Sequence, residues 1–437
     1  MAHHLSEDVV IEILPWLPVE SLLRFKSVCK SWYTLITNSA FITQHLHNKK
    51  KISDQKHLLV KYCPESTRDN VFSLFSSYKS KTNSNNQLLD LPDILSTISN
   101  RNLPHPEIFD RNIQIVGSCN GLVCLLGETY IVVWNPAIRE VSKLVLIPES
   151  APSPHYYYEK PKVRFSVYGF GFDVVTNDYK VVRMLKFSYH DDYNDDYEGN
   201  MVIEVYNLGS DSWRKIDENQ VPASIMCSYN GLYDCGTTCP NYGNKITISK
   251  TFCWWGHDCC EAIVSFDMTT ETIHQTFMPD DVNVFLRKEI YSMNEMGTCF
   301  SILNDYVAMI LFPNLHSFNK KYFDIWVLHE FGAKDSWQKL FRVGPLQGIE
   351  RVLGFWNNSN ELLLEDGLGQ LVMYRPTTNG AGGTVKLPAC ITLQCGALLR
   401  SLQVITYMES LVSLPKDLNE SRRQSLIFKK YWLQNRD

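Results

Sequence analysis

The chain carries little net charge and no long apolar run. Its formal net charge is −5 over 437 residues, so charge alone implies no polyanionic partner such as a nucleic acid. The apolar run Tyr306–Phe312 is short, whereas a membrane-crossing helix needs about 20 residues. We therefore expect neither a nucleic acid nor a membrane as a partner.

The N-terminal residues also lack the features of a secretory signal. The stretch MAHHLSEDVV has no basic segment followed by an apolar segment. The 13 cysteines are then expected to stay as free thiols in a reducing compartment, and their odd number leaves at least one unpaired. The expected location is the cytoplasm, with the nucleus as an open alternative.

The usual short motifs of hydrolases, nucleotide-binding proteins and zinc proteases are missing. The chain contains no G-x-S-x-G, no Walker loop and no H-E-x-x-H. The stretch Gly169–Val174 (GFGFDV) has two glycines but not the third glycine of a dinucleotide-binding loop. We therefore expect no enzyme activity, no catalytic residue and no cofactor.

One group of cysteines is dense enough to raise the alternative of a zinc site. It consists of Cys227, Cys235, Cys239, Cys253, Cys259 and Cys260, with His257 nearby. Thiolate and imidazole ligands suit tetrahedral zinc. However, the group contains no C-x-x-C pair, and two of its members are adjacent in the sequence. Free thiols are the favoured interpretation, so no metal site is predicted.

Residues 5–47 follow a helical pattern. Ser6 can cap a first helix, Pro15 ends or kinks that helix, and Pro18 opens the next one. The stretch Leu17–Trp32 carries more apolar side chains than a single helical stripe can bury, and they are interrupted by basic residues and serines. This surplus predicts that part of the helical surface contacts another protein.

From about residue 56 the pattern changes to short β-branched and aromatic runs separated by Gly, Asn, Asp and Pro turns, which is typical of strands. Five segments share one form, in which an apolar strand ends in an aromatic residue and is followed by a polar turn and a second strand. The aromatic anchors are Trp134, Tyr206, Phe266, Trp326 and Tyr374, at intervals of 72, 60, 60 and 48 residues. A kelch-like propeller blade takes about 50 residues, so the longer intervals indicate insertions.

The two ends of the β-rich region supply the material for one more blade. Residues 56–75 and 402–414 remain unassigned, and pairing them would close the ring and remove exposed strand edges. The predicted fold is an α+β multidomain chain. A small all-α motif is followed by an all-β, propeller-like domain of five to seven blades.

Residues 5–46 resemble an F-box, from Leu5 through EILPWLPVESLLRFKSVCKSWYTLI to FITQHL. One departure is Ser6, because the family usually has proline after this leucine. In that family the motif binds a Skp-family adaptor and, through it, the cullin and RING subunits of a ubiquitin ligase. The resemblance implies that the adaptor-binding residues are Leu5, Ile13, Leu14, Leu17, Pro18, Leu22, Leu23, Val28, Cys29 and Trp32.

The β-rich region resembles the plant F-box-associated domain. The matching pieces are SCNGLVCL, VVWNPAIRE, GFGFDVVTNDYKVVR, VYNLGSDSWRKI, VSFDMTTETI and YMESLVSLPK. Within that class the chain resembles the S-locus F-box proteins of pollen, most of all in FDIWVLHEFGAKDSWQKLF and ITYMESLVSLPKD. The resemblance implies an F-box in residues 1–50, a kelch-like substrate-binding domain in residues 51–415 and a basic tail in residues 416–437.

The function implied by these resemblances is that of a non-catalytic substrate receptor in an SCF-type ubiquitin ligase. S-locus F-box proteins recognise non-self S-ribonucleases in pollen self-incompatibility, and the same target is implied here. The first alternative is an F-box receptor for another target outside the S-locus. The second is a propeller enzyme tethered to the ligase, against which the absence of clustered acid–base motifs argues.

An acidic, tyrosine-bearing stretch lies between two predicted strands of one blade. It contains Asp191, Asp192, Tyr193, Asp195, Asp196, Tyr197 and Glu198. It fails as a calcium-binding loop, because Tyr197 stands where that loop requires glycine. The stretch is either a solvated loop or a recognition loop for a basic protein substrate, since loops on a rigid scaffold carry binding and tyrosines anchor interfaces.

Overall fold

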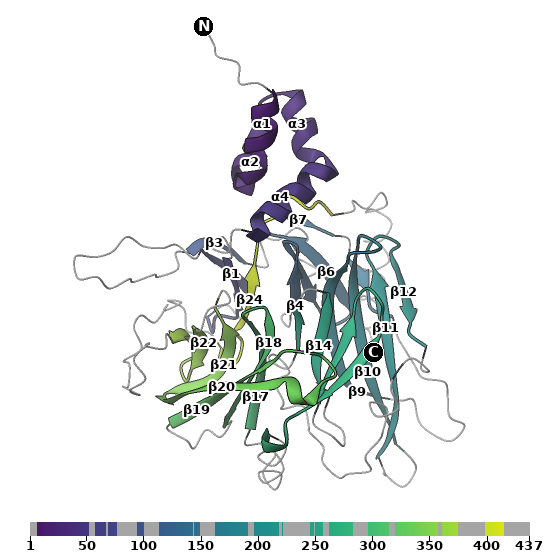
Figure 1. The fold of residues 1–437 in the computed structure, drawn as a ribbon, viewed down its shortest axis with the longest axis vertical. Helices are drawn as coiled ribbons and strands as arrows, with labels where there is room; N and C mark the ends of the chain where they lie inside the picture. The colour runs from purple at the N-terminus through teal and green to yellow at the C-terminus, as the bar shows by residue number, and fades with distance from the viewer. Residues whose placement is uncertain are drawn as a thin grey trace, which may run out of the picture.

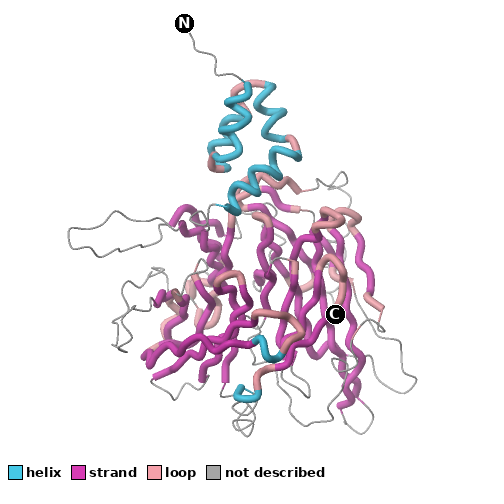
Figure 2. Tube along the Cα trace, in the orientation of Figure 1, coloured by secondary structure: helices cyan, strands magenta, loops and turns pink. Residues whose placement is uncertain are grey.

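The computed structural model describes residues 7–51, 57–66, 69–76, 94–99, 113–142, 144–148, 162–190, 196–217, 221, 245–248, 250–256, 262–282, 296–313, 320–356, 361–374 and 398–414. Within these ranges the helices gather at the N-terminus and strands dominate the rest (Figure 2). No helix in this part of the chain is long and apolar enough to cross a membrane.

The N-terminal helices form a small unit that stands on one face of the β-rich domain (Figure 1). Both prolines of this unit lie where a helix needs no N–H donor: Pro15 lies in the 3-10 turn after the first helix, and Pro18 precedes the second. The helices, in chain order, are α1 (Glu7–Ile13), η1 (Leu14–Trp16), α2 (Val19–Phe25), α3 (Lys30–Thr37) and α4 (Ser39–Lys51).

The described strands form six separate antiparallel sheets, which are the blades of a propeller. From the inner strand outward, the first three blades are β24 (Gln403–Tyr407), β1 (His57–Tyr62), β2 (Val71–Ser76) and β3 (Ile94–Ser99); β4 (Gln114–Cys119), β5 (Leu122–Leu126), β6 (Tyr130–Asn135) and β7 (Glu140–Val141), with β8 (Val145–Leu146) also paired to β6; and β9 (Lys162–Asp173), β10 (Asp178–His190), β11 (Asp196–Asn207) and β12 (Ser212–Lys215).

The remaining blades are β13 (Lys245–Ile248), β14 (Thr251–Gly256), β15 (Ala262–Asp267) and β16 (Ile273–Phe277); β17 (Met296–Leu303), β18 (Tyr306–Pro313), β19 (Lys320–Leu328) and β20 (Trp337–Gln347); and β21 (Ile349–Phe355), β22 (Leu362–Asp366) and β23 (Leu371–Tyr374). The inner strands of neighbouring blades contact one another around the ring. The fold class predicted from the sequence is confirmed, and the blade count is six.

The aromatic strand of the predicted repeat is the third strand in five of the six blades. All five aromatic anchors lie in the third strand of a blade, namely β6, β11, β15, β19 and β23. The polar turn that follows is stabilised by a side-chain cap in several blades. For example, the Asp267 carboxylate accepts the main-chain N–H groups of Thr269 and Thr270 at 2.8 and 3.0 Å. In this blade the polar residue just after the aromatic anchor Phe266 ends the strand and starts the turn.

The ring closes as the sequence predicts, because β24 from the C-terminal region pairs with β1 from the N-terminal region. The register runs from His57 opposite Tyr407 to Lys61 opposite Gln403. The closing strand is shorter than expected, however. It ends at Tyr407, and residues 408–414 continue along the surface of the second blade without strand pairing.

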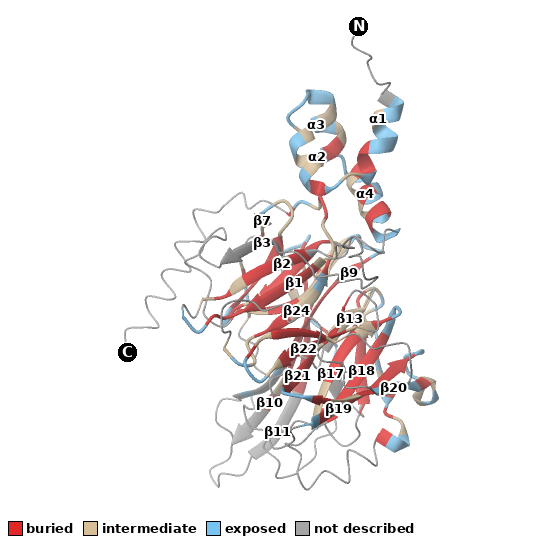
Figure 3. Cartoon of the chain, turned by 90° about the vertical axis from the view of Figure 1, so that its left-hand side faces the viewer, coloured by how far each residue is buried: buried red, intermediate tan, exposed pale blue. Residues whose placement is uncertain are grey.

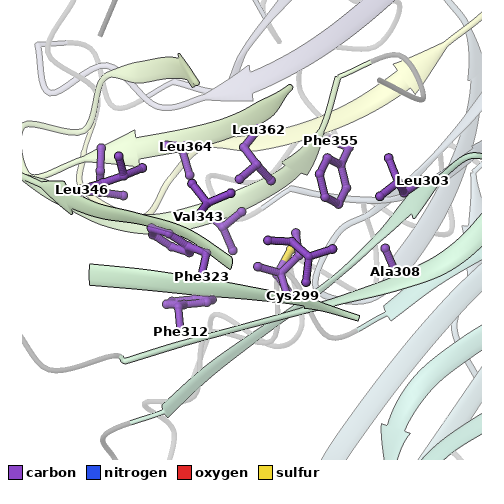
Figure 4. Packing of buried hydrophobic residues seen from close by; sticks show 14 of the residues in the cluster. Cys299, Leu303, Ala308, Phe312, Phe323, Val343, Leu346, Phe355, Leu362 and Leu364 are labelled. Atoms are coloured by element: carbon purple, nitrogen blue, oxygen red, sulfur yellow. The ribbon is translucent and has the colours of Figure 1, made fainter. Parts of the chain in front are cut away.

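Apolar side chains fill the spaces between neighbouring blades. Figure 4 shows the packing between the fifth and sixth blades, where Phe323 and Val343 face Leu362 and Leu364. The intervening Leu363 points the other way, into the cluster between the sixth and first blades. Side chains alternate across a strand, so a blade with neighbours on both faces needs a continuous apolar run.

The strand directions define two faces of the propeller. Neighbouring strands of a blade are antiparallel, so the first–second and third–fourth connections share one face. The helical unit packs against Ala137 and Ile138 in the β6–β7 turn, so we call this the helix face. The connections between second and third strands, including the β10–β11 connection, begin and end on the opposite face.

Candidate protein-interaction surfaces

The helical unit has a small apolar core that includes residues of the propeller. Leu22 and Ile36 are fully enclosed in it. Leu411, which follows the closing strand, is buried in the same cluster, and Ala137 and Ile138 pack against it. The helical unit is therefore docked on the propeller by apolar contact. Its enclosed residues are Leu14, Val19, Leu22, Ile36 and Phe41.

Polar contacts fix the orientation of α4 within this unit. A ring nitrogen of His45, Nε2, lies 3.0 Å from the carbonyl oxygen of Leu17. The side-chain amide of Asn48 donates to the carbonyl of Pro15 at 3.4 Å. Both contacts join α4 to the segment around η1 and so fix the position of the last helix relative to the start of the helical unit.

Charged groups from the two parts of the chain meet at the docking interface. The Glu409 carboxylate accepts the N–H of Val19, and burial raises its pKa although the nearby Lys49 ammonium opposes this shift. Burial lowers the pKa of Lys49, opposed in turn by Glu409. His57 Nε2 lies 4.0 Å from the same carboxylate. Burial thus disfavours the charged form of each group, and the attraction between Lys49 of α4 and Glu409 after β24 partly offsets it.

His57 at this interface predicts a pH dependence of stability. Burial, followed by the charge of Lys49, lowers the pKa of His57 to about 4. The unfolded chain, with a pKa near 6.5, binds a proton as the pH falls from about 6.5 to 4, and the folded chain does not. The resulting loss of stability through this window is on the order of 3 kcal/mol.

The variant His57→Phe is expected to remove this part of the acid sensitivity. Urea unfolding at pH 7 and at pH 4.5 measures it. The free energy of unfolding of the unmodified protein should fall by about 2–3 kcal/mol more than that of the variant. Equal losses would show that His57 does not contribute.

Several large apolar side chains of the helical unit are exposed to solvent. Figure 3 shows exposed residues along α1 and α3, whereas the strands of the propeller are mostly buried. Among described residues, 17 large apolar side chains are exposed, and six of them lie in the short range 7–51. They are Val9, Ile11, Ile13, Trp16, Val28 and Tyr33, with 40–60% of their surface exposed. Exposed apolar groups gathered on one small unit indicate a protein-binding surface.

The adaptor-binding residues predicted from the sequence fall into three groups. Ile13, Pro18, Val28 and Cys29 are exposed, and Leu17, Leu23 and Trp32 are partly buried. Leu14 and Leu22 have at most 2% of their surface exposed and support the unit from within. Leu5 lies outside the described residues. Trp16 and Tyr33 were not predicted, although large aromatic residues in so short a polar-edged unit are a signal for binding.

The acidic stretch is part hairpin strand and part connection. Asp196, Tyr197 and Glu198 belong to β11, where they lie opposite His190, Tyr189 and Ser188 of β10. These two strands are 13 and 12 residues long and are therefore longer than most of the other described strands. Asp191, Asp192, Tyr193 and Asp195 lie outside the described residues. The end of β10 and the start of β11, where His190 pairs with Asp196, lie on the opposite face.

Of the cysteine group that raised the zinc alternative, the structure describes Cys253. It is fully enclosed in β14 among apolar residues of the fourth and fifth blades, and burial raises the pKa of its thiol well above the usual range. The other cysteines of the group and His257 lie outside the described residues. Over the described ranges, no cluster of three His, Cys, Asp or Glu side chains could hold a metal ion.

A closed propeller that carries a docked helical unit with exposed apolar residues defines a protein-interaction module, and comparison with known proteins agrees. The F-box domain matches residues 3–44, and the F-box associated beta propeller domain matches residues 70–414. The chain belongs to the family of F-box proteins with an F-box associated beta propeller domain.

Relatives of this chain are found in Arabidopsis thaliana. The F-box protein CPR1 is 25% identical over 387 residues, which covers 84% of this chain and 81% of that protein. An F-box/kelch-repeat protein is 26% identical over 384 residues, with 85% and 86% covered. Neither relative's name refers to the S-locus, so these two matches do not test that resemblance.

Among solved structures, a post-proline cleaving enzyme from Rickettsia typhi aligns with a TM-score of 0.27 and 10% identity, covering 82% of this chain and 43% of the enzyme. That TM-score supports no conclusion about this chain.

Proposed function

We propose that this protein is a non-catalytic substrate receptor of an SCF-type ubiquitin ligase in the cytoplasm, with the nucleus as a second location. The observation that carries the proposal is the exposed apolar surface of the F-box helices, with Ile13 and Val28 at 50% and 60% exposure. Such a surface suits a Skp-family adaptor, which would connect the chain to the cullin and RING subunits.

The docking of the F-box on the propeller supports the same role. A receptor must hold its substrate at a defined position relative to the ligase. Here the F-box shares the buried Leu411 with the propeller, and the Asn135 side chain holds the flanking segment by donating to the carbonyls of Ser410 and Val412 at 3.1 and 2.7 Å. The substrate would then bind on the opposite face.

Reconstitution tests this function. The purified protein should form a stable complex with a Skp-family adaptor, a cullin and a RING subunit, and that complex should ubiquitinate a protein bound to the propeller. Failure of the chain to bind any Skp-family adaptor would contradict the proposal. Turnover of a small substrate by the isolated chain would favour the alternative of a tethered enzyme.

For the substrate, we propose a basic protein that contacts the acidic hairpin, and the S-locus resemblance makes a non-self S-ribonuclease the specific candidate. Carboxylates crowded into a short segment create a local negative field that attracts a cationic partner. Another target protein outside the S-locus is the alternative. Expression confined to pollen would favour the S-ribonuclease, and expression throughout the leaf would favour the other target.

Neutralising the acidic hairpin is expected to slow association with an S-ribonuclease. The variant replaces Asp191, Asp192, Asp195 and Asp196 with Asn and Glu198 with Gln. Stopped-flow or biosensor kinetics should show an association rate reduced about three- to tenfold at low salt, with little difference near 1 M salt, because screening removes the long-range attraction. An unchanged association rate at low salt would show that the acidic stretch is a solvated loop and does not attract the substrate.

A further inference from the structure

Four described turns on the helix face share one form. Each follows an Asn or Asp at the end of a strand and holds its fourth residue in the left-handed backbone region, at φ values of 53–58°. The turns therefore differ mainly in the side chains at their first three positions. They are residues 136–139, 174–177, 208–211 and 268–271.

In three of these turns the aliphatic side chains pack against apolar neighbours. Leu208 and Met268 open their turns and are 7% and 0% exposed; small or hydroxyl-bearing residues follow each of them. In the turn 136–139, Ala137 and Ile138 pack against the helical unit. This last turn shows that apolar residues on the helix face can dock another segment of the chain.

The turn 174–177 between β9 and β10, called the valine turn below, is the exception. Val174 and Val175 are 64% and 77% exposed. The turn does not need their side chains, because the Asp173 carboxylate accepts the main-chain N–H of Val175 at 2.9 Å and the hydroxyl of Thr176 at 2.8 Å. Two neighbouring valines in a turn that polar residues would form equally well indicate a contact surface.

The described part of the chain ends close to this turn. Leu414 is 5% exposed and lies in the apolar cluster between the second and third blades, which includes Leu208 and, partly buried, Tyr179. The Leu208 N–H donates to the carbonyl of Tyr179 at 2.9 Å, and Tyr179 lies just after the valine turn. The Leu414 N–H donates to the carboxylate of Glu140 at 3.1 Å. The chain therefore leaves the described residues on the helix face, at the boundary between the second and third blades.

The sequence that follows Leu414 carries an apolar stretch among basic residues. Residues 415–437 lie outside the described residues. The spacer 415–425 reaches about 35 Å when extended, so it does not prevent a contact with the valine turn. The apolar residues of the stretch 426–433 are Leu426, Ile427, Phe428, Tyr431, Trp432 and Leu433, and the basic residues in and before it are Arg422, Arg423, Lys429 and Lys430.

A carboxylate beside the valine turn complements these basic residues. Asp178 directly follows the turn and accepts the main-chain N–H groups of Tyr179 and Gly209, both at 2.8 Å, and the side-chain amide of Asn207 at 3.3 Å. None of these donors is charged, so they do not neutralise the carboxylate. A cation from a docked segment would therefore find an opposite charge next to the exposed valines.

The small size of the apolar surface favours a tethered segment over a separate protein. A stable interface between two proteins covers about 800 Å² on each partner, far more than two valine side chains provide. A segment of the same chain is instead present at an effective concentration on the order of millimolar. A small apolar contact is then enough to hold it.

We propose that residues 426–433 dock on the valine turn, with the neighbouring basic residues beside Asp178. The contact lies within one chain, on the face that carries the F-box. It covers Val174 and Val175 as the helical unit covers Ala137 and Ile138 one blade away. It does not depend on the proposed ligase function.

Amide hydrogen exchange of the full chain tests this contact. Exchange of residues 426–433 should be about tenfold or more slower than in a synthetic peptide of residues 420–437, and the double variant Val174→Ser, Val175→Ser should exchange at the peptide rate. Both valines are exposed and serine suits turns, so the variant should stay folded.

The matched control is Leu368→Ser. Leu368 is 72% exposed in the turn between β22 and β23 on the opposite face, and its replacement should leave the exchange of residues 426–433 unchanged. Exchange at the peptide rate in the unmodified protein, or full protection in the valine double variant, would overturn the proposal.

Photo-crosslinking of the full chain identifies what covers the turn. The variant Val175→p-benzoylphenylalanine should crosslink to residues 426–433 of the same chain, as mass spectrometry of the monomer band would show. Crosslinks only between two chains would assign the turn to a second copy and overturn the proposal. Weaker binding of a Skp-family adaptor by the double variant Val174→Ser, Val175→Ser, with unchanged exchange of residues 426–433, would assign the turn to the adaptor and overturn it as well.

Discussion

Replacing Ile13 and Val28 with aspartate is expected to weaken binding of a Skp-family adaptor by about 100-fold or more, because two charges would have to be desolvated in an apolar contact. Both side chains are half or more exposed, so the substitution changes the surface and not the core. Biolayer interferometry with a purified adaptor measures the affinity. The thermal unfolding of the propeller should stay within a degree or two of that of the unmodified protein.

The matched control places the same charges on the opposite face. Val163 and Leu368 are 52% and 72% exposed, and their replacement with aspartate should leave adaptor binding unchanged. Leu22→Asp is a poor test, because Leu22 is fully enclosed and its loss would disrupt the helical unit itself. Near-normal adaptor affinity of the Ile13→Asp, Val28→Asp variant would show that the adaptor surface lies elsewhere.

Ending the chain at Leu402 is expected to abolish cooperative unfolding of the propeller. This truncation removes β24, the inner strand of the first blade, and with it the fully enclosed Tyr407 and Leu411, which is 2% exposed. The inner edge of β1 would then present unpaired N–H and C=O groups, and the ring would open between two blades. Circular dichroism and differential scanning calorimetry should show loss of the transition and aggregation.

Two other truncations act as controls. Ending the chain at Leu414 keeps β24 and the segment that carries Leu411, so the transition should be retained. Beginning the chain near Asp54 removes the F-box but keeps β1, so unfolding should stay cooperative. Its midpoint should fall by a few degrees, because Leu411, Ala137 and Ile138 lose their cover. If the chain ending at Leu402 unfolded as cooperatively as the one ending at Leu414, ring closure by β24 would not be what stabilises the propeller.

The repeat and its closure could be predicted because both depend on local patterns. A strand buried between two blades needs an apolar run, and its turn needs a polar residue that caps the main chain. The pairs Trp134–Asn135 and Phe266–Asp267 show this sequence pattern directly. The leftover ends had to pair because an open ring would expose two strand edges. The predicted closing segment was too long only where residues 408–414 turn to contact the second blade.

The position of the F-box on the propeller could not be predicted, because it depends on residues far apart in the chain. The Asn135 side chain bonds the Ser410 carbonyl across 275 residues, and the Tyr407 hydroxyl accepts the N–H of Ala137 at 3.1 Å. These pairs cannot be recognised from any periodic pattern in the sequence. They exist because β24 returns to the ring beside the second blade and continues under the helical unit.

The sequence by itself determined the F-box, the propeller and the surplus of apolar residues that marks a binding surface, since each is carried by residue spacing within a few turns of chain. Only the tertiary structure decided which of those residues face solvent. Leu14 and Leu22 look no different from Ile13 and Val28 in the sequence, yet the first pair is enclosed and the second exposed.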